Sequence, residues 1–270
     1  MKSVMVLLFS LFLSGNTMAQ VVWVRNYDVA VTVAKKSNKL IVMDFWAIWC
    51  KPCLLMDEKL WENAEMKELA NNFICLRVNY DYDFKLVSQY AVRAIPRVII
   101  ITAGGEVLYD NLGFMNEESY LAVFRAIPGD IGELNKRSVA QAENRKDLQA
   151  NYSLGTEFQR IGKNIANAEL KGNFLSCGAK YLARAQNLCS DPALTEEIEL
   201  YSVLNDIYAG REQKALKTIE KMNPVPGNDT LAELRHFVLA ECYKSIGDQD
   251  NFLKHKQLIR KQELVSQLND

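Results

Sequence analysis

Two cysteines, Cys50 and Cys53, are separated by two residues in the stretch "FWAIWCKPC", directly after a run of large apolar side chains. Three chemistries use this spacing: half of a zinc site, a ligand pair for a metal cluster, and a dithiol that opens and closes as a disulfide. A zinc site needs four ligands, yet no second Cys-x-x-Cys pair exists, and the two histidines, His236 and His255, lie far along the chain. The pattern therefore favours a redox dithiol that needs neither a metal nor another cofactor.

The position of Cys50 predicts that it is the attacking thiol. It lies where a strand gives way to a helix, so its sulfur faces the free N–H groups and the positive end of the helix dipole, which favours the thiolate. Lys51 adds a nearby positive charge, and Pro52 is compatible with the first turn of a helix. Cys53 lies one turn further on the same helix face, where it can resolve a mixed disulfide.

Residues 1–19 have the layout of a secretory signal peptide. A lysine at position 2 precedes an apolar run of ten residues, and small residues follow as far as Ala19. The run is shorter than the roughly 20 apolar residues that span a bilayer. We expect cleavage after Ala19 and export to the periplasm without a membrane span, with an uncleaved anchor as the alternative. An exported protein meets an oxidising compartment, in which disulfides persist.

The composition gives no basis for binding nucleic acid, because 32 basic and 33 acidic residues leave a formal net charge of −1. A chain of 270 residues holds one large or two modest domains, and the sequence pattern favours two. Residues 20–128 alternate strand-like and helical patterns, and a hairpin signal lies around Gly104-Gly105. Asn116 is the predicted N-cap of the last helix. This order predicts a central mixed sheet with helices on both faces, an α/β fold.

These residues resemble the thioredoxin family. The stretch "VMDFWAIWCKPC" is similar to the family's active-site strand and turn, with its buried acid at Asp44 and its tryptophan at Trp49. The stretch "YAVRAIPRVIII" is similar to the segment that holds the family's cis-proline, here Pro96. The resemblance covers residues 21–127 and implies a secreted thioredoxin-like domain that exchanges disulfides with protein substrates.

Two departures from the family's pattern leave the redox potential and the substrate preference open. Lys51-Pro52 stands between the cysteines where Gly-Pro is common, and Arg97 follows the proline where a small residue is usual. A cis bond at Pro96 would place the backbone of Ile95 beside Cys50, free to pair with an extended substrate. Trp49 is assigned to the rim of the site, and Trp49, Lys51, Pro52 and Ile95 are the predicted substrate-binding residues.

Asp44 lies in the middle of an apolar strand, where an ionised carboxylate is costly unless it has a partner. The resemblance implies that it lies behind Cys53 and relays the proton of that thiol, with a pKa raised by desolvation. A strand-edge aspartate that faces water is the alternative. Arg77, on the next strand, stands where the family often has a lysine near the acid, and a solvated strand charge is an equally open interpretation.

Residues 129–270 lose the β-branched runs and predict five or six helices, with breaks at Gly172, Pro192, Gly210, residues 223–229 and Gly247. Three stretches each predict a helix, a turn and a second helix, and they loosely resemble degenerate tetratricopeptide repeats; they are residues 154–188, 200–222 and 237–259. An irregular helical bundle is the alternative. The short link after Pro128 favours a fixed attachment to the first domain.

Four further cysteines have less certain roles. Cys75 falls in an apolar strand and is predicted to be a small buried side chain. Cys177 and Cys189 lie too far apart to pair within one straight helix, so a disulfide there needs Cys242 or a broken helix. Three free thiols remain the other possibility.

Two functions follow from these observations. The first is an exported thiol–disulfide oxidoreductase that acts on disulfide-containing proteins in the reducing direction, because no histidine between the cysteines stabilises the thiolate. Such a reductase requires electrons from a membrane donor with thiols of its own. The second is a helical-repeat binding protein that uses the thioredoxin fold as a docking platform.

Overall fold

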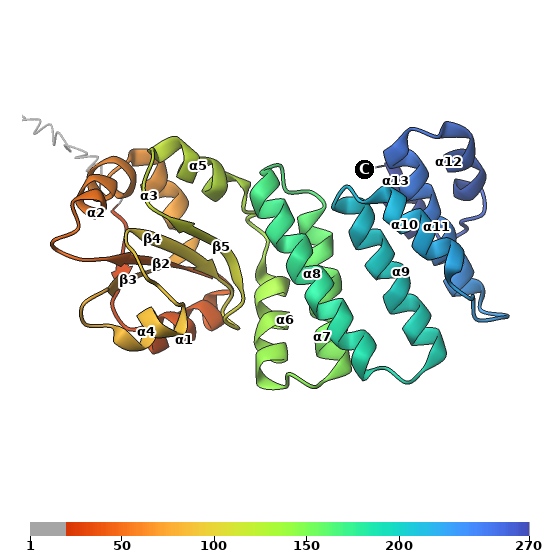
Figure 1. The fold of residues 1–270 in the computed structure, drawn as a ribbon, viewed down its shortest axis with the longest axis horizontal. Helices are drawn as coiled ribbons and strands as arrows, with labels where there is room; N and C mark the ends of the chain where they lie inside the picture. Colours follow the sequence, from red (N-terminus) through yellow and green to blue (C-terminus); the bar gives the residue numbers. More distant parts are fainter. Residues whose placement is uncertain (1–19, 270) are drawn as a thin grey trace, which may run out of the picture.

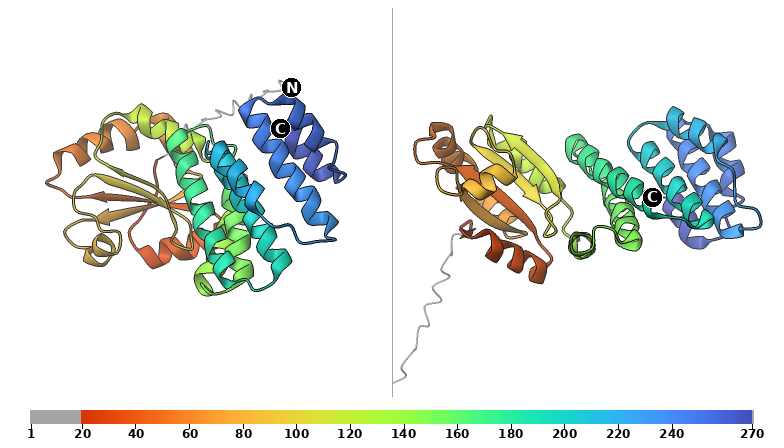
Figure 2. Two further views of the ribbon diagram at one scale, coloured as in Figure 1. Left: turned by 45° about the vertical axis from the view of Figure 1, so that its right-hand side comes forward. Right: turned by 60° about the horizontal axis from the view of Figure 1, so that its bottom comes forward.

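The computed structural model describes residues 20–269, so the predicted signal peptide lies outside the described residues. A unit that contains the sheet forms one end of an elongated molecule, and a stack of helices forms the other end (Figure 1). The same arrangement is visible in two further orientations (Figure 2). Within residues 20–269, no helix combines the length and the apolar character that crossing a membrane requires.

The sheet has five strands in the order β1-β3-β2-β4-β5. Their bounds are Trp23–Val24 (β1), Leu40–Trp46 (β2), Phe73–Asn79 (β3), Arg97–Ile101 (β4) and Val107–Leu112 (β5). β3 pairs in parallel with β1 and β2, whereas β4 runs antiparallel to both β2 and β5. This is the predicted mixed sheet with its terminal hairpin. β1 was not predicted, because a strand of two residues carries no alternation pattern.

The central strand β2 is buried on both faces, as expected for a strand with neighbours and helices on every side. Leu40 and Val42 belong to the core on one face, and Ile41, Met43 and Phe45 belong to the core on the other. The first face is covered by α2 (Lys51–Met56), the π-helix η1 (Asp57–Trp61), α3 (Ala64–Ala70) and α5 (Glu117–Ala126). The second is covered by α1 (Tyr27–Ser37) and α4 (Phe84–Gln89) (Figure 1).

Local signals explain several helix boundaries in this unit. The Asn116 side chain accepts a hydrogen bond from the Ser119 N–H at the start of α5, as predicted for an N-cap. Three helical elements, α2, η1 and α3, follow Cys50, and the last has its N-cap at Asn63, whose side chain accepts from the N–H groups of Glu65 and Met66. The Gly104-Gly105 turn joins β4 to β5, and Gly105 has a φ of 91°, which glycine adopts without strain.

Eight helices follow in the described part of the chain, rather than five or six. They are α6 (Gly132–Glu143), α7 (Leu148–Gly162), α8 (Ala168–Leu188), α9 (Pro192–Tyr208), α10 (Glu212–Lys221), α11 (Asp229–Ile246), α12 (Gln249–Lys256) and α13 (Gln262–Asn269). The predicted breaks at Pro192, Gly210 and Gly247 are present, but the break at Gly172 was wrong. Gly172 lies inside α8, where a glycine costs only about 1 kcal/mol relative to alanine. The three predicted stretches form the helical hairpins α7–α8, α9–α10 and α11–α12.

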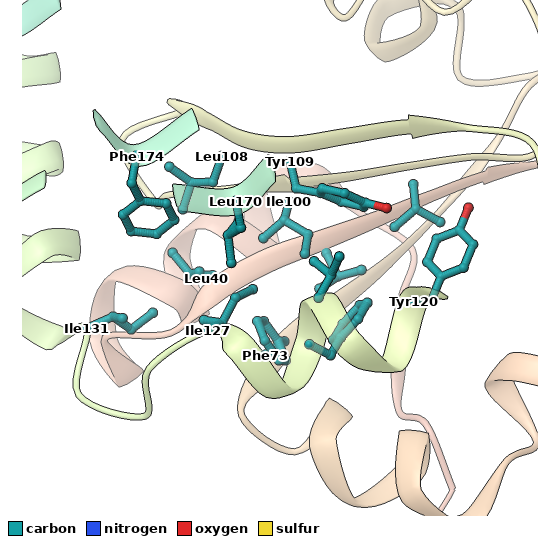
Figure 3. Packing of buried hydrophobic residues seen from close by; sticks show 14 of the residues in the cluster. Leu40, Phe73, Ile100, Leu108, Tyr109, Tyr120, Ile127, Ile131, Leu170 and Phe174 are labelled. Carbon is teal, nitrogen blue, oxygen red and sulfur yellow. The ribbon is translucent and has the colours of Figure 1, made fainter. Parts of the chain in front are cut away.

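The helices nearest the sheet share its hydrophobic core. Leu170 and Phe174 of α8 lie beside Leu108 and Tyr109 of β5 and Ile100 of β4 (Figure 3). All five side chains are nearly or fully buried. The boundary at residue 128 therefore stays a proposal, with α6, α7 and α8 packed into the same core as the sheet.

Polar contacts fix the same junction. The buried Asn135 side chain of α6 donates to the Lys39 carbonyl oxygen and accepts from the Ala103 N–H at 2.8 Å. Thr102 and Ser138 share a hydroxyl hydrogen bond of 2.6 Å. These bonds tie α6 to the ends of β2 and β4, which agrees with the expected fixed attachment.

The shared core predicts that a change in α8 weakens the sheet. Phe174→Ala should lower the free energy of unfolding by about 3–5 kcal/mol, the usual loss for a fully buried phenylalanine. All four tryptophans lie between Trp23 and Trp61, so tryptophan fluorescence during denaturation reports the sheet unit alone. The midpoint of the tryptophan fluorescence transition of Phe174→Ala should therefore shift to a lower denaturant concentration.

Phe237→Ala is the matched control, because Phe237 is equally buried in a second core, all of whose residues lie after position 199. It should shift the unfolding of helical circular dichroism and leave the tryptophan transition in place. An unchanged tryptophan transition in Phe174→Ala would show that the sheet does not depend on α8.

Candidate active site

Cys50 and Cys53 form a disulfide at the beginning of α2, with their Cα atoms 5.2 Å apart. Cys50 is the N-cap of the helix, and its Sγ accepts a hydrogen bond from the Cys53 N–H at 3.2 Å. Pro52 lies in the first turn, where its missing N–H removes no helical hydrogen bond, and Lys51 is exposed. The Cys50 sulfur thus lies at the positive end of a helix.

The disulfide is almost closed to solvent, because Cys50 is 3% exposed and Cys53 is 1% exposed. Ile95 packs against this cysteine pair, and the Ile95–Pro96 peptide bond is cis. The Pro96 carbonyl oxygen accepts a hydrogen bond from the Gly113 N–H at 2.7 Å. Within the described chain, the backbone N–H and C=O of Ile95 have no hydrogen-bond partner, so both groups are available to an extended peptide.

Trp49 lies at the rim of the site with 60% of its surface exposed. Its indole N–H donates to the Asp81 carboxylate at 2.9 Å, and its ring meets Tyr80 edge to face at 6.4 Å. Tyr80 also packs against the cysteine pair. The loop after β3 therefore fixes the orientation of the exposed tryptophan beside the disulfide.

Asp44 is completely buried on β2, and Arg77 lies directly opposite it on β3. The Arg77 Nε is 3.2 Å from the Asp44 carboxylate, close enough for an ion pair but without the alignment of a hydrogen bond. The Arg77 Nη2 donates to Asp57 at 2.7 Å. The guanidinium lies over the ring of Trp46 at 4.4 Å and over that of Trp23 at 5.1 Å.

Burial raises the pKa of Asp44 from 3.8 to about 7. The positive charge of Arg77 lowers this pKa, and the negative charge of Asp57 raises it. Neither oxygen of the Asp44 carboxyl group has a hydrogen bond of good geometry in the described chain, but the indole N–H of Trp61 lies close enough to lower the pKa. A buried carboxyl group with a pKa near neutrality can take up or release a proton under ordinary conditions.

Asp57 was missed by the sequence analysis. It follows Cys53 by four residues, which places it about one helical turn further along. This spacing was the available signal, but only the pairing of β3 with β2 shows that Arg77 reaches it. Arg97, the other departure from the family pattern, is held by two hydrogen bonds of 2.6 Å from its Nε and Nη2 to the Asp110 carboxylate.

The remaining cysteines are free thiols, which was one of the two open possibilities. Cys75 is buried as predicted, Cys177 and Cys242 are also buried, and Cys189 is half-buried just after α8. Burial raises the pKa of Cys75 and Cys177 to about 12 and that of Cys242 to about 11.

The two histidines, 19 residues apart in the sequence, are close together in space. The Nδ1 atoms of His236 and His255 are 3.0 Å apart on α11 and α12. Within residues 20–269, no group of three or more histidine, cysteine or acidic side chains is arranged to hold a metal ion.

A disulfide at a helix N-terminus supports thiol–disulfide exchange, and the same unit buries a carboxyl group of raised pKa on β2. The cysteine pair can take up two electrons, and the carboxyl group can accept a proton. The fold and this pair together support a thiol–disulfide oxidoreductase.

Comparison with known proteins agrees with this geometry. A family model described as thioredoxin-like matches residues 22–103. A thioredoxin from Chlorobaculum thiosulfatiphilum is 34% identical over 77 residues, which cover 28% of this chain and 68% of that protein. A thioredoxin from Acidithiobacillus ferridurans is 36% identical over 77 residues, covering 28% and 69%. One from Alicyclobacillus acidocaldarius is 32% identical over 91 residues, covering 34% and 84%. The chain therefore belongs to the thioredoxin family.

Proposed function

We propose that the protein is an exported reductase of protein disulfides that works through Cys50 and Cys53. The observation that carries the proposal is the cysteine pair at the start of α2, with Ile95 packed against it. In the reduced enzyme the Cys50 thiolate attacks a substrate disulfide, forms a mixed disulfide and releases one substrate sulfur as a thiolate. Cys53 then attacks the Cys50 sulfur, which releases the second substrate thiol and restores the Cys50–Cys53 disulfide.

Asp44 accepts the proton of Cys53 in the second step. A thiol must become a thiolate before it attacks, and a buried carboxylate whose conjugate acid has a pKa of about 7 is matched to that transfer. Arg77 and Asp57 act as positioning residues, since one lowers and the other raises the pKa of Asp44. These opposite effects on the pKa of Asp44 partly offset each other, and a pKa near neutrality lets the carboxyl group gain and lose a proton within one catalytic cycle.

Substrates bind across the surface formed by Trp49, Lys51, Pro52 and Ile95. Trp49 offers an exposed ring fixed by Asp81, and the free backbone groups of Ile95 can pair with an extended peptide. Such contacts recognise the backbone of the substrate rather than its side chains, so they are compatible with many different protein disulfides.

Each turnover transfers two electrons to the substrate, and these electrons must be replaced. We propose a membrane-bound donor with its own thiols, because the predicted export places the protein in an oxidising compartment. The reducing direction rests on the residues between the cysteines, Lys51 and Pro52, neither of which stabilises the Cys50 thiolate as a histidine would.

The helical part supports a second, accessory role in holding partners near the disulfide. Its three helical hairpins form a continuous stack attached to the sheet (Figure 2). Stacked helical hairpins present long surfaces to other proteins, so this part can prolong contact with a partner.

Cys50→Ser should abolish reduction of a small synthetic disulfide, because the remaining thiol of the pair, Cys53, is not at the N-cap of α2, where the helix end favours the thiolate. Cys53→Ala should retain the first attack and accumulate mixed disulfides that non-reducing electrophoresis and mass spectrometry detect. Cys189→Ser removes a half-buried free thiol and should leave both results unchanged. Activity that survives Cys50→Ser would refute the proposed mechanism and favour a docking function.

Asp44→Asn should change the pH dependence of stability in the oxidised protein. The folded-state pKa of about 7 lies above the reference value of 3.8, so the folded protein keeps a proton that the unfolded chain releases between these values. The free energy of unfolding therefore falls as pH rises through this range. The Asp44→Asn variant has no titrating group at this position, so its free energy of unfolding does not fall in this way. Above pH 7 it should be more stable than the native protein by up to ~4 kcal/mol.

Denaturant titrations across this pH range measure the effect on stability. The same variant should slow disulfide reduction by roughly tenfold or more, because the resolving thiol loses its base. Asp110→Asn is a suitable control, since that carboxylate belongs to an ion pair on the β4–β5 hairpin. Equal stability–pH curves for Asp44→Asn and the native protein would contradict the buried-acid assignment.

A further inference from the structure

A cavity of about 490 Å³ lies at the junction of the sheet and the helices. Its walls come from the Gly104-Gly105 turn between β4 and β5, from the end of α6 and from the last turns of α8. Figure 1 shows these helices beside β5. The cavity lies at the opposite end of β4 from Pro96, so it is separate from the disulfide.

The charged side chains of this cavity are mostly basic. Three of them are Arg145, Lys180 and Arg184, and the single acidic side chain is Glu106. Lys180 donates to both oxygens of Glu106, at 2.5 and 2.6 Å, and the Tyr181 hydroxyl donates to Glu106 at 2.5 Å. Both carboxylate oxygens of Glu106 therefore already accept hydrogen bonds, and its charge neutralises Lys180 rather than the two arginines.

Arg145 and Arg184 have no carboxylate partner within the described chain, which distinguishes them from most arginines of the sheet unit. Arg184 lies against the ring of Tyr181 at 5.2 Å, a contact that orients the guanidinium without neutralising it. Both arginines are exposed and line the same concave surface, so together they give it a positive potential. An anion bound between them gains two charge-assisted sets of hydrogen bonds.

The remaining walls limit the size and chemistry of that anion. Ala142 and Leu188 contribute apolar surface, and Asn187 contributes an amide. The volume is within the range of about 300–1,000 Å³ that holds small organic ligands and is large for an inorganic ion. Arginine forks match carboxylate and phosphate oxygens in a bidentate manner.

We propose that this cavity binds a small organic molecule with two oxyanionic groups, each held by one of the arginines Arg145 and Arg184. The carbon skeleton of the ligand lies against Ala142 and Leu188. Because the site joins the β4–β5 turn to α6 and α8, the bound ligand also bridges the sheet unit and the helices. This site is independent of the proposed reductase activity.

Isothermal titration calorimetry of the full chain at low ionic strength tests the proposal. Citrate probes the carboxylate class and fructose 1,6-bisphosphate probes the phosphate class, so the two titrations also identify the preferred oxyanion. Arg145→Gln and Arg184→Gln should each weaken the binding probe about tenfold to a hundredfold, the loss expected for a charged hydrogen-bonded contact. Neither variant should change the melting temperature appreciably without ligand, because both side chains are exposed.

Glu106→Gln should change the affinity in the opposite direction from the two arginine variants. It keeps a hydrogen-bond acceptor for Tyr181 but releases Lys180 into the cavity, so it should tighten the binding of the same probe. Arg260→Gln removes one positive charge from an exposed arginine between α12 and α13, outside the cavity, and should leave the affinity unchanged.

Three results would overturn the proposal. One is the absence of heat from both probes at about millimolar concentration. Another is equal weakening by Arg260→Gln and Arg184→Gln, which would indicate a general charge effect. The third is binding of a short glutamate-rich peptide, tested in parallel, when neither small anion binds, which would assign the cavity to a protein partner instead.

Discussion

The guanidinium of Arg77 lies against the rings of Trp23 and Trp46 and offers its nitrogens to Asp44 and Asp57. These contacts join β1, β2, β3 and η1 around one positive charge. A buried charge is tolerated only when its surroundings neutralise and solvate it, so the four elements cannot shift independently. The two-residue strand β1 has a role out of proportion to its length, because it supplies one of the two rings. The proton affinity of Asp44 follows from this arrangement rather than from burial alone.

A second constraint is the core that β4 and β5 share with α6, α7 and α8. The sheet uses one face for the redox site and for its attachment to the helices, because Leu40, Val42 and Asp44 alternate along the same side of β2. The distance from the disulfide to the helical surface is therefore set by a packed core and not by a linker. A partner that contacts both the disulfide and the helices therefore binds a surface of fixed shape, which favours partners of complementary shape.

Local patterns predicted the parts of the fold that local chemistry determines. The apolar run of β2, the Gly104-Gly105 turn and the Asn116 cap need only their neighbours in sequence. The wrong break at Gly172 has the opposite cause, since α8 is stabilised by packing of Leu170 and Phe174 against the sheet, which outweighs the low helix propensity of one glycine.

The same distinction holds for the site. Cys50 and Cys53 can be recognised from their spacing in the sequence. Asp57 and the cavity arginines Arg145 and Arg184 can be recognised only from contacts between segments that are distant in the sequence.

The folded protein also protects its free thiols from thiol–disulfide exchange. Burial raises the pKa of Cys75, Cys177 and Cys242, and none of them lies at a helix N-terminus as Cys50 does, so they remain protonated and are poor nucleophiles. Only Cys189 is partly accessible among the free thiols of the described chain. The high pKa of the buried free thiols thus works as a kinetic safeguard: a molecule with six cysteines can exchange electrons through two of them without rearranging its own disulfide.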